Sequence, residues 1–139
     1  MSKEQNFNTE SIRKACTIAY EAYDKGDFKR ALRIFYQAWL SLPKPQTDLE
    51  QAGWVLTGIG DTYFRLHQYL QGCEALKSAQ HCPGMSNNPF VHLRKGQCLY
   101  HLGERIPARQ ELKKAYDIAG AKIFVNEKDT YLNLIRDLT

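Results

Sequence analysis

Between Gly26 and Pro43 the sequence reads Gly26-Asp27-Phe28-x2-Ala31-x3-Phe35-x2-Ala38-x4-Pro43. Gly26 suits the left-handed backbone just past the end of a helix, which other residues adopt only with strain. The alanines would let a neighbouring helix come close, and the two phenylalanines would fill the spaces between those contacts. The stretch therefore predicts a tight turn followed by a helix that packs against its predecessor.

The same arrangement recurs along the chain, because three 34-residue windows align when they begin at Ile12, Gly53 and Pro89. Each window divides into two helical segments separated by a short turn. Small residues share positions in the three windows: Ala19, Gly60 and Gly96; Ala31, Gly72 and Ala108; Ala38, Ala79 and Ala115. The turns are Lys25-Gly26-Asp27, Leu66-His67-Gln68 and Leu102-Gly103-Glu104. Three in-phase copies predict an array of antiparallel helix pairs.

These landmarks resemble the tetratricopeptide repeat family, whose pattern runs Trp-x2-Leu-Gly-x2-Tyr, a Gly-Asp-Tyr-type turn, Ala-x3-Phe-x2-Ala and a closing Pro. The first window matches every second-helix landmark, and Ile59-Gly60-x2-Tyr63 matches the first helix of the second window. The departures are Gly72 in place of alanine, an early Pro83, and His92 and Lys95 where Trp and Leu are usual. The resemblance covers roughly residues 12–122 and implies an all-α solenoid of three helix hairpins.

Local signals mark where several helices start. Thr47-Asp48-Leu49-Glu50 has the spacing of a capping box, so we expect the first helix of the second repeat to start early. Asn88 precedes Pro89 as an N-cap before a first-turn proline, and Pro107 falls in the first turn of another helix.

The end of the chain is expected to cap the array with a seventh helix. Its apolar stripe has the spacing i, i+3, i+4, i+7 and consists of Tyr131, Leu134, Ile135 and Leu138. Residues 120–132 are also similar to the tail of small bacterial tetratricopeptide proteins. We therefore predict one domain over residues 1–139, with repeats at about 12–45, 53–86 and 89–122 and a cap at 123–139.

The composition, 43% hydrophobic and 24% charged in 139 residues, is that of an ordinary folded protein. The net charge of +4 is spread along the chain without a block of like charges, which disfavours a nucleic-acid partner. Residues 1–5 contain no apolar core, and no stretch approaches the length of a membrane span. We expect a cytoplasmic protein with free thiols at Cys16, Cys73, Cys82 and Cys98.

Catalytic and metal-binding patterns are weak. Cys98 and His101 are three residues apart on one predicted helix, and Asp61 could orient them, but a buried thiol beside an exposed histidine explains both residues without catalysis. The cysteines and histidines lack the paired close spacings of a zinc site. The sequence also has no Gly-rich phosphate loop and no G-x-S-x-G motif. We therefore expect no enzyme activity, no catalytic residues, no metal and no cofactor.

The resemblance implies that the first helix of each repeat lines a concave surface facing a protein ligand. The corresponding positions of this sequence are rich in aromatics and arginine, the residues that supply most binding energy at protein interfaces. We predict partner-binding roles for Arg13, Tyr20, Tyr23, Trp54, Asp61, Phe64, Arg65, Phe90, Arg94, Gln97, Tyr100 and His101. Two or three of the aromatics are expected to fill space between repeats instead.

Two more specific uses of the surface are disfavoured. In the clamp that holds the C-terminal carboxylate of heat-shock chaperones, four places would be taken by Cys16, Tyr20, Gly58 and Phe90, and only Arg94 fits. A terminal carboxylate would lose its water there with too little compensation. Basic residues on the second helices are interpreted as a solvated convex face, since no aromatic stacking platform accompanies them: Lys29, Arg33, Arg105, Arg109 and Lys113.

Non-enzymatic binding of another protein in the groove is therefore the main hypothesis. Small bacterial tetratricopeptide proteins include immunity proteins that neutralise a toxin, and the mixture of arginines with Asp61 favours such a folded, charged target. The alternatives are a chaperone or adaptor that takes an extended segment of a secreted protein, and a scaffold that self-associates through Trp39 or Tyr116. We expect a monomer, with a homodimer as the alternative.

Overall fold

The computed structural model describes residues 8–139, and within this range the regular structure is entirely helical. The all-α prediction is confirmed; residues 1–5, on which the expectation of a missing leader rests, lie outside the described range. The α-helices are α1 (Thr9–Asp24), α2 (Phe28–Leu40), α3 (Glu50–Arg65), α4 (Tyr69–Gln80), α5 (Pro89–His101), α6 (Arg105–Ala119) and α7 (Asp129–Asn133). Short 3-10 turns are η2 (Gln46–Asp48), η3 (Ala121–Phe124) and η4 (Arg136–Leu138).

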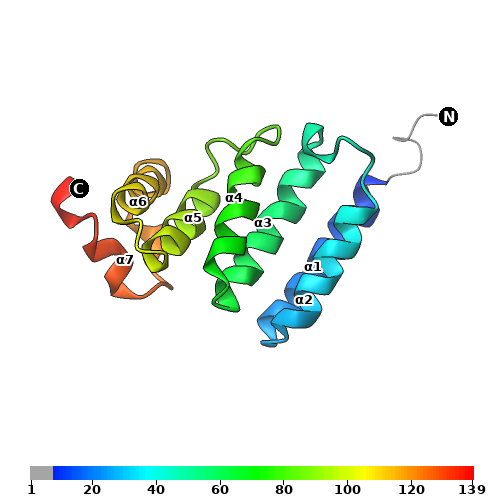
Figure 1. Cartoon of the computed structure of the whole chain (residues 1–139), viewed down its shortest axis with the longest axis horizontal. Helices are drawn as coiled ribbons and strands as arrows, with labels where there is room; N and C mark the ends of the chain where they lie inside the picture. Colours follow the sequence, from blue (N-terminus) through cyan, green and yellow to red (C-terminus); the bar gives the residue numbers. More distant parts are fainter. Residues whose placement is uncertain (1–7) are drawn as a thin grey trace.

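The six long helices form three antiparallel hairpins, α1/α2, α3/α4 and α5/α6, that stand side by side (Figure 1). Glycines make the close approaches possible. A Cβ atom on Gly58 would lie 2.2 Å from the Phe35 ring, and one on Gly60 would lie 2.4 Å from Leu76. The small-residue positions therefore mark helix-to-helix contacts, as the sequence pattern predicts.

The three hairpin turns share one left-handed residue. Gly26 has φ 82° and Gly103 has φ 80°, as expected for glycine just past a helix end. The equivalent position of the middle turn is His67, with φ 60°. A non-glycine residue is strained in this conformation, although histidine tolerates it better than most.

Of the predicted helix starts, those at Asn88, Pro107 and the early start of α3 are confirmed, and the capping box is not. The Asn88 side chain accepts hydrogen bonds from the backbone N–H groups of Phe90 and Val91, which confirms that N-cap. Pro107 is the third residue of α6, and α3 starts early, at Glu50. The capping box is wrong, because Thr47 belongs to η2 and the N-cap of α3 is Leu49, which has no capping side-chain bond.

The predicted seventh helix is much shorter than expected. The α-helix ends at Asn133, and the chain continues into η4. Arg109 Nε donates to the carbonyl of Leu134 at 3.0 Å, and the Leu138 N–H turns to Ile135 instead. The Leu134 carbonyl thus bonds to α6 and not to Leu138, and of the stripe only Tyr131 and Ile135 are buried.

Two core clusters follow from this arrangement. The larger one runs through α1 to α5, and the smaller one joins α5 and α6 to the end of the chain through Leu93, Leu112, Phe124, Tyr131 and Ile135. The end of the chain is thus an integral part of the packing. Among residues 8–139, no helix is long and apolar enough to cross a membrane.

Candidate partner-binding surface

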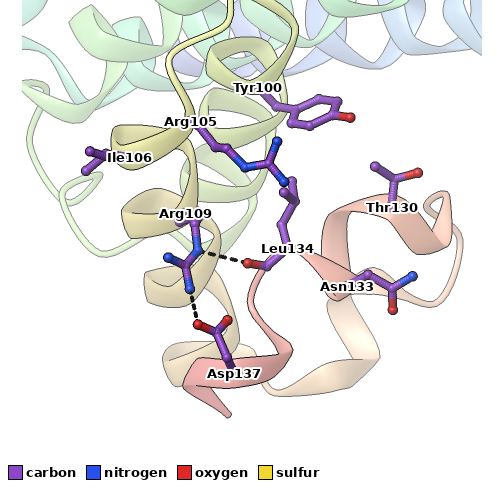
Figure 2. A pocket seen from close by; sticks show the side chains of 8 residues that line it. All are labelled: Tyr100, Arg105, Ile106, Arg109, Thr130, Asn133, Leu134 and Asp137. Atoms are coloured by element: carbon purple, nitrogen blue, oxygen red, sulfur yellow. Dashed lines mark hydrogen bonds and ion pairs between the residues drawn. The ribbon is translucent and has the colours of Figure 1, made fainter.

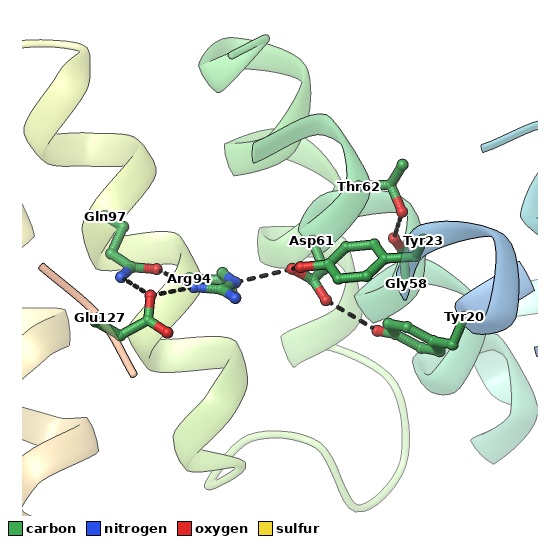
Figure 3. Close-up of polar contacts among 8 residues, drawn as sticks. All are labelled: Tyr20, Tyr23, Gly58, Asp61, Thr62, Arg94, Gln97 and Glu127. Atoms are coloured by element: carbon green, nitrogen blue, oxygen red, sulfur yellow. Dashed lines mark hydrogen bonds and ion pairs between the residues drawn. The ribbon is translucent and has the colours of Figure 1, made fainter. Parts of the chain in front are cut away.

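Helices α1, α3 and α5 share one face of the molecule. At its centre, the buried carboxylate of Asp61 connects the three helices. Asp61 on α3 accepts hydrogen bonds from the hydroxyls of Tyr20 at 3.2 Å and Tyr23 at 2.8 Å, both on α1. Arg94 on α5 donates from Nε to the same carboxylate at 2.8 Å. Figure 3 shows how these side chains converge from three helices. This network fixes the relative positions of the three hairpins.

The network continues into the segment between η3 and α7. Arg94 Nη1 donates to Glu127 at 2.6 Å and to Gln97 at 2.8 Å, and the Gln97 amide donates to Glu127 at 2.7 Å (Figure 3). Residues 124–131, which we call the closing segment, therefore lie over the α5 part of the shared face. Tyr131 secures the segment further, because its hydroxyl is hydrogen-bonded to His101 Nε2 at 2.8 Å.

Electrostatics keep the network charged and intact. Burial alone would lower the pKa of Arg94, but the carboxylates of Asp61 and Glu127 raise it above its ordinary value. Burial and the neighbouring Asp61 raise the pKa of Tyr23 to about 12 and also raise that of Tyr20. Both tyrosines thus remain protonated donors. Among the described residues, no buried side-chain nitrogen or oxygen lacks a hydrogen-bond partner.

The structure therefore splits the continuous wall that the sequence predicts. Asp61, Arg94 and Gln97 are buried, with 2%, 6% and 0% of their surface exposed. They differ from the open contact residues expected of them because Glu127 and the two tyrosines occupy their polar atoms. We call the α5 face under the closing segment the closed half.

Other predicted residues flank the closed half. The rings of Phe64 and Phe90 are half-buried on either side of the Arg94 guanidinium, at 4.7 and 5.0 Å from its carbon. Tyr100 is half-buried and packs edge-on against His101 and Tyr131. The Phe90 and Tyr100 rings thus contact other side chains of the chain, whereas Phe64 also lines a separate pocket.

The α1 and α3 part of the same face has no such cover from the described chain, and we call it the open half. A shallow cavity of about 540 Å³ lies there, lined by Arg13, Cys16, Thr17, Tyr20, Glu21, Asp24 and Trp54. The Arg13 guanidinium lies 4.8 Å from the centre of the Trp54 ring. The open half thus combines a large half-buried ring, a second ring held by Asp61, and an exposed cation.

A second hollow, of about 630 Å³, separates α6 from the end of the chain (Figure 2). Arg109 crosses it and binds both the Leu134 carbonyl and the Asp137 carboxylate. Lys113 pairs with Asp117 on α6. Two of the basic residues assigned to a solvated convex face are therefore engaged within the chain.

The structure does not arrange Cys98 and His101 as a catalytic pair. Cys98 is fully buried, and burial raises the pKa of its thiol to about 12, so the thiol stays protonated. The His101 ring is stacked on Tyr69 with centroids 4.2 Å apart. Within residues 8–139, no group of three or more histidine, cysteine or acidic residues could hold a metal ion.

Sequence reasoning missed Glu127 and the triad of His92, Lys95 and Glu111. His92 is hydrogen-bonded to Glu111, and Lys95 Nζ lies 2.9 Å from the same carboxylate. Although burial alone would raise the pKa of Glu111, these two partners lower it to about 2. A signal existed here, since His92 and Lys95 are the polar departures from the apolar repeat pattern.

Comparison with known proteins identifies the fold. No protein-family model matches the chain, and no curated protein matches it in sequence. The Yersinia enterocolitica type III secretion chaperone SycD, solved in complex with a peptide of the translocator YopD, matches with a TM-score of 0.72 and 16% identity over 94% of both chains.

Two further structures agree. An alternative dimer of SycD matches with a TM-score of 0.72 and 15% identity over 94% of this chain and 93% of that one. A CopN–Scc3 complex matches with a TM-score of 0.65 and 22% identity over 92% and 71%. At these identities the likeness establishes a tetratricopeptide-like helical fold.

Proposed function

We propose that this chain is a non-enzymatic chaperone that holds an extended segment of a secreted protein on its open half. The observation that carries the proposal is the contrast on the shared face, where residues 8–139 cover α5 but leave α1 and α3 uncovered. The shared fold with SycD, which was solved with a translocator peptide, supports this choice of partner.

The chemistry of the open half suits an extended peptide. The Trp54 ring offers a large rigid surface, and Tyr20 is held in place by Asp61, so little side-chain freedom is lost on binding. Arg13 and Thr17 add polar groups at the rim of the cavity. The Thr17 hydroxyl donates to the Arg13 carbonyl and can still accept a hydrogen bond. A shallow cavity of about 540 Å³ accommodates one or two side chains of such a segment.

The proposal replaces toxin immunity as the preferred function. The immunity hypothesis rests on the mixture of arginines with Asp61, and the burial of Arg94 and Asp61 removes two of these charges from the surface. Partner-binding candidates that stay exposed or half-buried include Arg13, Tyr20, Trp54, Phe64 and Arg65. A chaperone of this kind would act in the cytoplasm before its partner is exported, as a monomer or as a homodimer.

The test starts from the partner itself. The tagged full-length chain is purified from its source cells, captured proteins are identified by mass spectrometry, and overlapping 15-residue peptides of each are measured by fluorescence anisotropy. We expect one peptide of a secreted protein to bind, and Trp54→Ala to weaken it by roughly 10-fold or more. A matched control, Trp39→Ala, removes the other tryptophan, which lies on α2.

Three results would overturn the proposal. One is a partner that binds only as a folded domain, with no active peptide. Another is equal binding by the wild type and the Trp54→Ala variant. The third is a captured toxin whose activity the chain blocks, which would restore the immunity hypothesis.

A further inference from the structure

A separate pocket of about 400 Å³ lies where the turns of the first two hairpins approach the closing segment. Aromatic and basic side chains alternate around it. The aromatic residues are Phe28, Phe64, Tyr69 and Tyr131, and the basic ones include Arg65, His67 and Lys128. None of these three basic residues belongs to the buried Asp61 network.

The pocket carries unbalanced positive charge. The exposed Arg65 guanidinium lies over the rings of Phe28 at 5.2 Å and Tyr23 at 5.5 Å. Neither Arg65 nor Lys128 forms an ion pair with a carboxylate in residues 8–139. Glu127 also lines the pocket, but Arg94 and Gln97 already bind its carboxylate. An incoming anion would thus meet cations that lack a partner.

The backbone of His67 adds an independent observation. Its position is the one that Gly26 and Gly103 occupy in the other two turns, and it has φ 60° without the freedom of glycine. The exposed His67 ring stacks on Tyr69, with centroids 5.8 Å apart and planes inclined by 14°. Strained non-glycine residues of this kind concentrate at binding sites. A side chain is therefore kept at the rim of the pocket where glycine would fit the backbone better.

We propose that this pocket binds an acidic side chain of the partner segment together with the apolar residue next to it. The carboxylate would pair with Arg65 and Lys128, and the apolar neighbour would pack on Phe28, Phe64 and Tyr69. The inference rests on the proposed function, because the segment that crosses the open half supplies the acidic residue. The chain's own net charge of +4 fits an acidic partner.

The experiment is a 1H–15N NMR titration of the full-length chain with a short probe. The acidic probe is acetyl-Gly-Asp-Phe-Asp-Gly-amide, and its uncharged match is acetyl-Gly-Asn-Phe-Asn-Gly-amide. We expect the acidic probe to shift the amides of residues 64–69, 101–103 and 126–128, and the uncharged probe to bind at least threefold more weakly. Raising the salt concentration to 0.5 M should reduce this difference. Equal binding of the two probes, or shifts confined to other regions, would overturn the pocket.

Variants separate this pocket from general charge. Arg65→Gln and Lys128→Gln should each weaken the acidic probe by about threefold or more. The matched control Arg33→Gln removes one exposed charge from α2 and should have no effect. His67→Gly should weaken the probe while the thermal midpoint stays the same or rises, since glycine relieves the backbone. If Arg33→Gln costs as much affinity as Arg65→Gln, the attraction is unspecific and the proposal is wrong.

The outcome is distinguishable from that of the proposed function. Loss of the acid preference with Trp54-dependent peptide binding intact rejects the pocket alone. Loss of Trp54-dependent binding rejects the chaperone proposal, whatever the short probe does.

Discussion

The two halves of the shared face are held together by different interactions. The closed half relies on buried charge, since Arg94 joins Asp61 to Glu127. The open half relies on aromatic packing and on glycine contacts such as Gly58 against Phe35. The difference teaches that one half binds a segment of its own chain, whereas no segment of residues 8–139 covers the other, which is the half we propose for a partner.

The largest effect should come from removing the cation that the closed half shares with the open one. Arg94→Met leaves the buried carboxylates of Asp61 and Glu127 without their charged donor. We expect urea unfolding to show a loss of about 3–5 kcal/mol. Arg33→Met, an exposed site on α2, should change stability by less than about 0.5 kcal/mol. Similar stabilities for the two variants would remove the central role of the network.

Acid should destabilise the third hairpin, α5/α6, before the first two, because Glu111 on α6 pairs with His92 and Lys95 on α5. The folded-state pKa of Glu111 is lowered from 4.5 to about 2, so its stabilisation is complete above pH 4.5 and is lost as the pH falls from about 4.5 to about 2. The expected loss is roughly 2–3 kcal/mol. Both tryptophans lie in the first two hairpins, on α2 and α3. Circular dichroism should therefore report loss of helix at a higher pH than tryptophan fluorescence reports any change, and Glu111→Gln should flatten the first transition.

Glu127→Gln should loosen the closed half without unfolding it. The amide keeps one acceptor for Arg94 and Gln97 but removes the charge, at a cost of about 1–2 kcal/mol. We expect faster hydrogen exchange in residues 121–139 and unchanged exchange in α1 to α4. Glu74→Gln, on the exposed side of α4, serves as the control. Protection of residues 121–139 equal to that of wild type would mean that apolar packing alone holds the closing segment.

The smallest effect is expected on the open half. Arg13 has 58% of its side chain exposed, lies over the Trp54 ring and pairs with the exposed Glu10 on its own helix. Arg13→Gln should therefore change the free energy of unfolding by less than about 0.5 kcal/mol in a urea titration. A loss above about 1 kcal/mol would show that this surface supports the fold rather than standing ready for a ligand.

The sequence predicts the hairpins well because close helix packing constrains residues at fixed spacing. Gly60 and Gly96 occupy places where a Cβ atom would collide with a leucine, so the repeat pattern carries that geometry. The same alignment puts His67 at the repeat position of Gly26 and Gly103. The strained backbone of the middle turn could therefore have been predicted from the sequence. Sequence spacing therefore predicts a contact when both residues lie in the same repeat or in adjacent repeats.

The closure of the α5 face could not be predicted in the same way. Glu127 meets Arg94 and Gln97 from about thirty residues away in sequence, and no helical period links them. Just past the early end of α7, Arg109 likewise binds the Leu134 carbonyl from about 25 residues away in sequence. A residue's place in the repeat predicts whether it lies on the shared face. Whether the chain itself covers that residue depends on the path of the closing segment, which the repeat pattern does not describe.

Glu127 closes the shared face at α5. Under the proposed function, this would limit the length of the bound segment. With helix axes about 8–10 Å apart, the width of two hairpins is roughly 20 Å, which an extended strand crosses in about six residues. A guest that enters past α1 must stop or turn away at Arg94. If the proposed function holds, the Glu127 contacts would set the register of the bound segment, because they fix where the open part of the face ends.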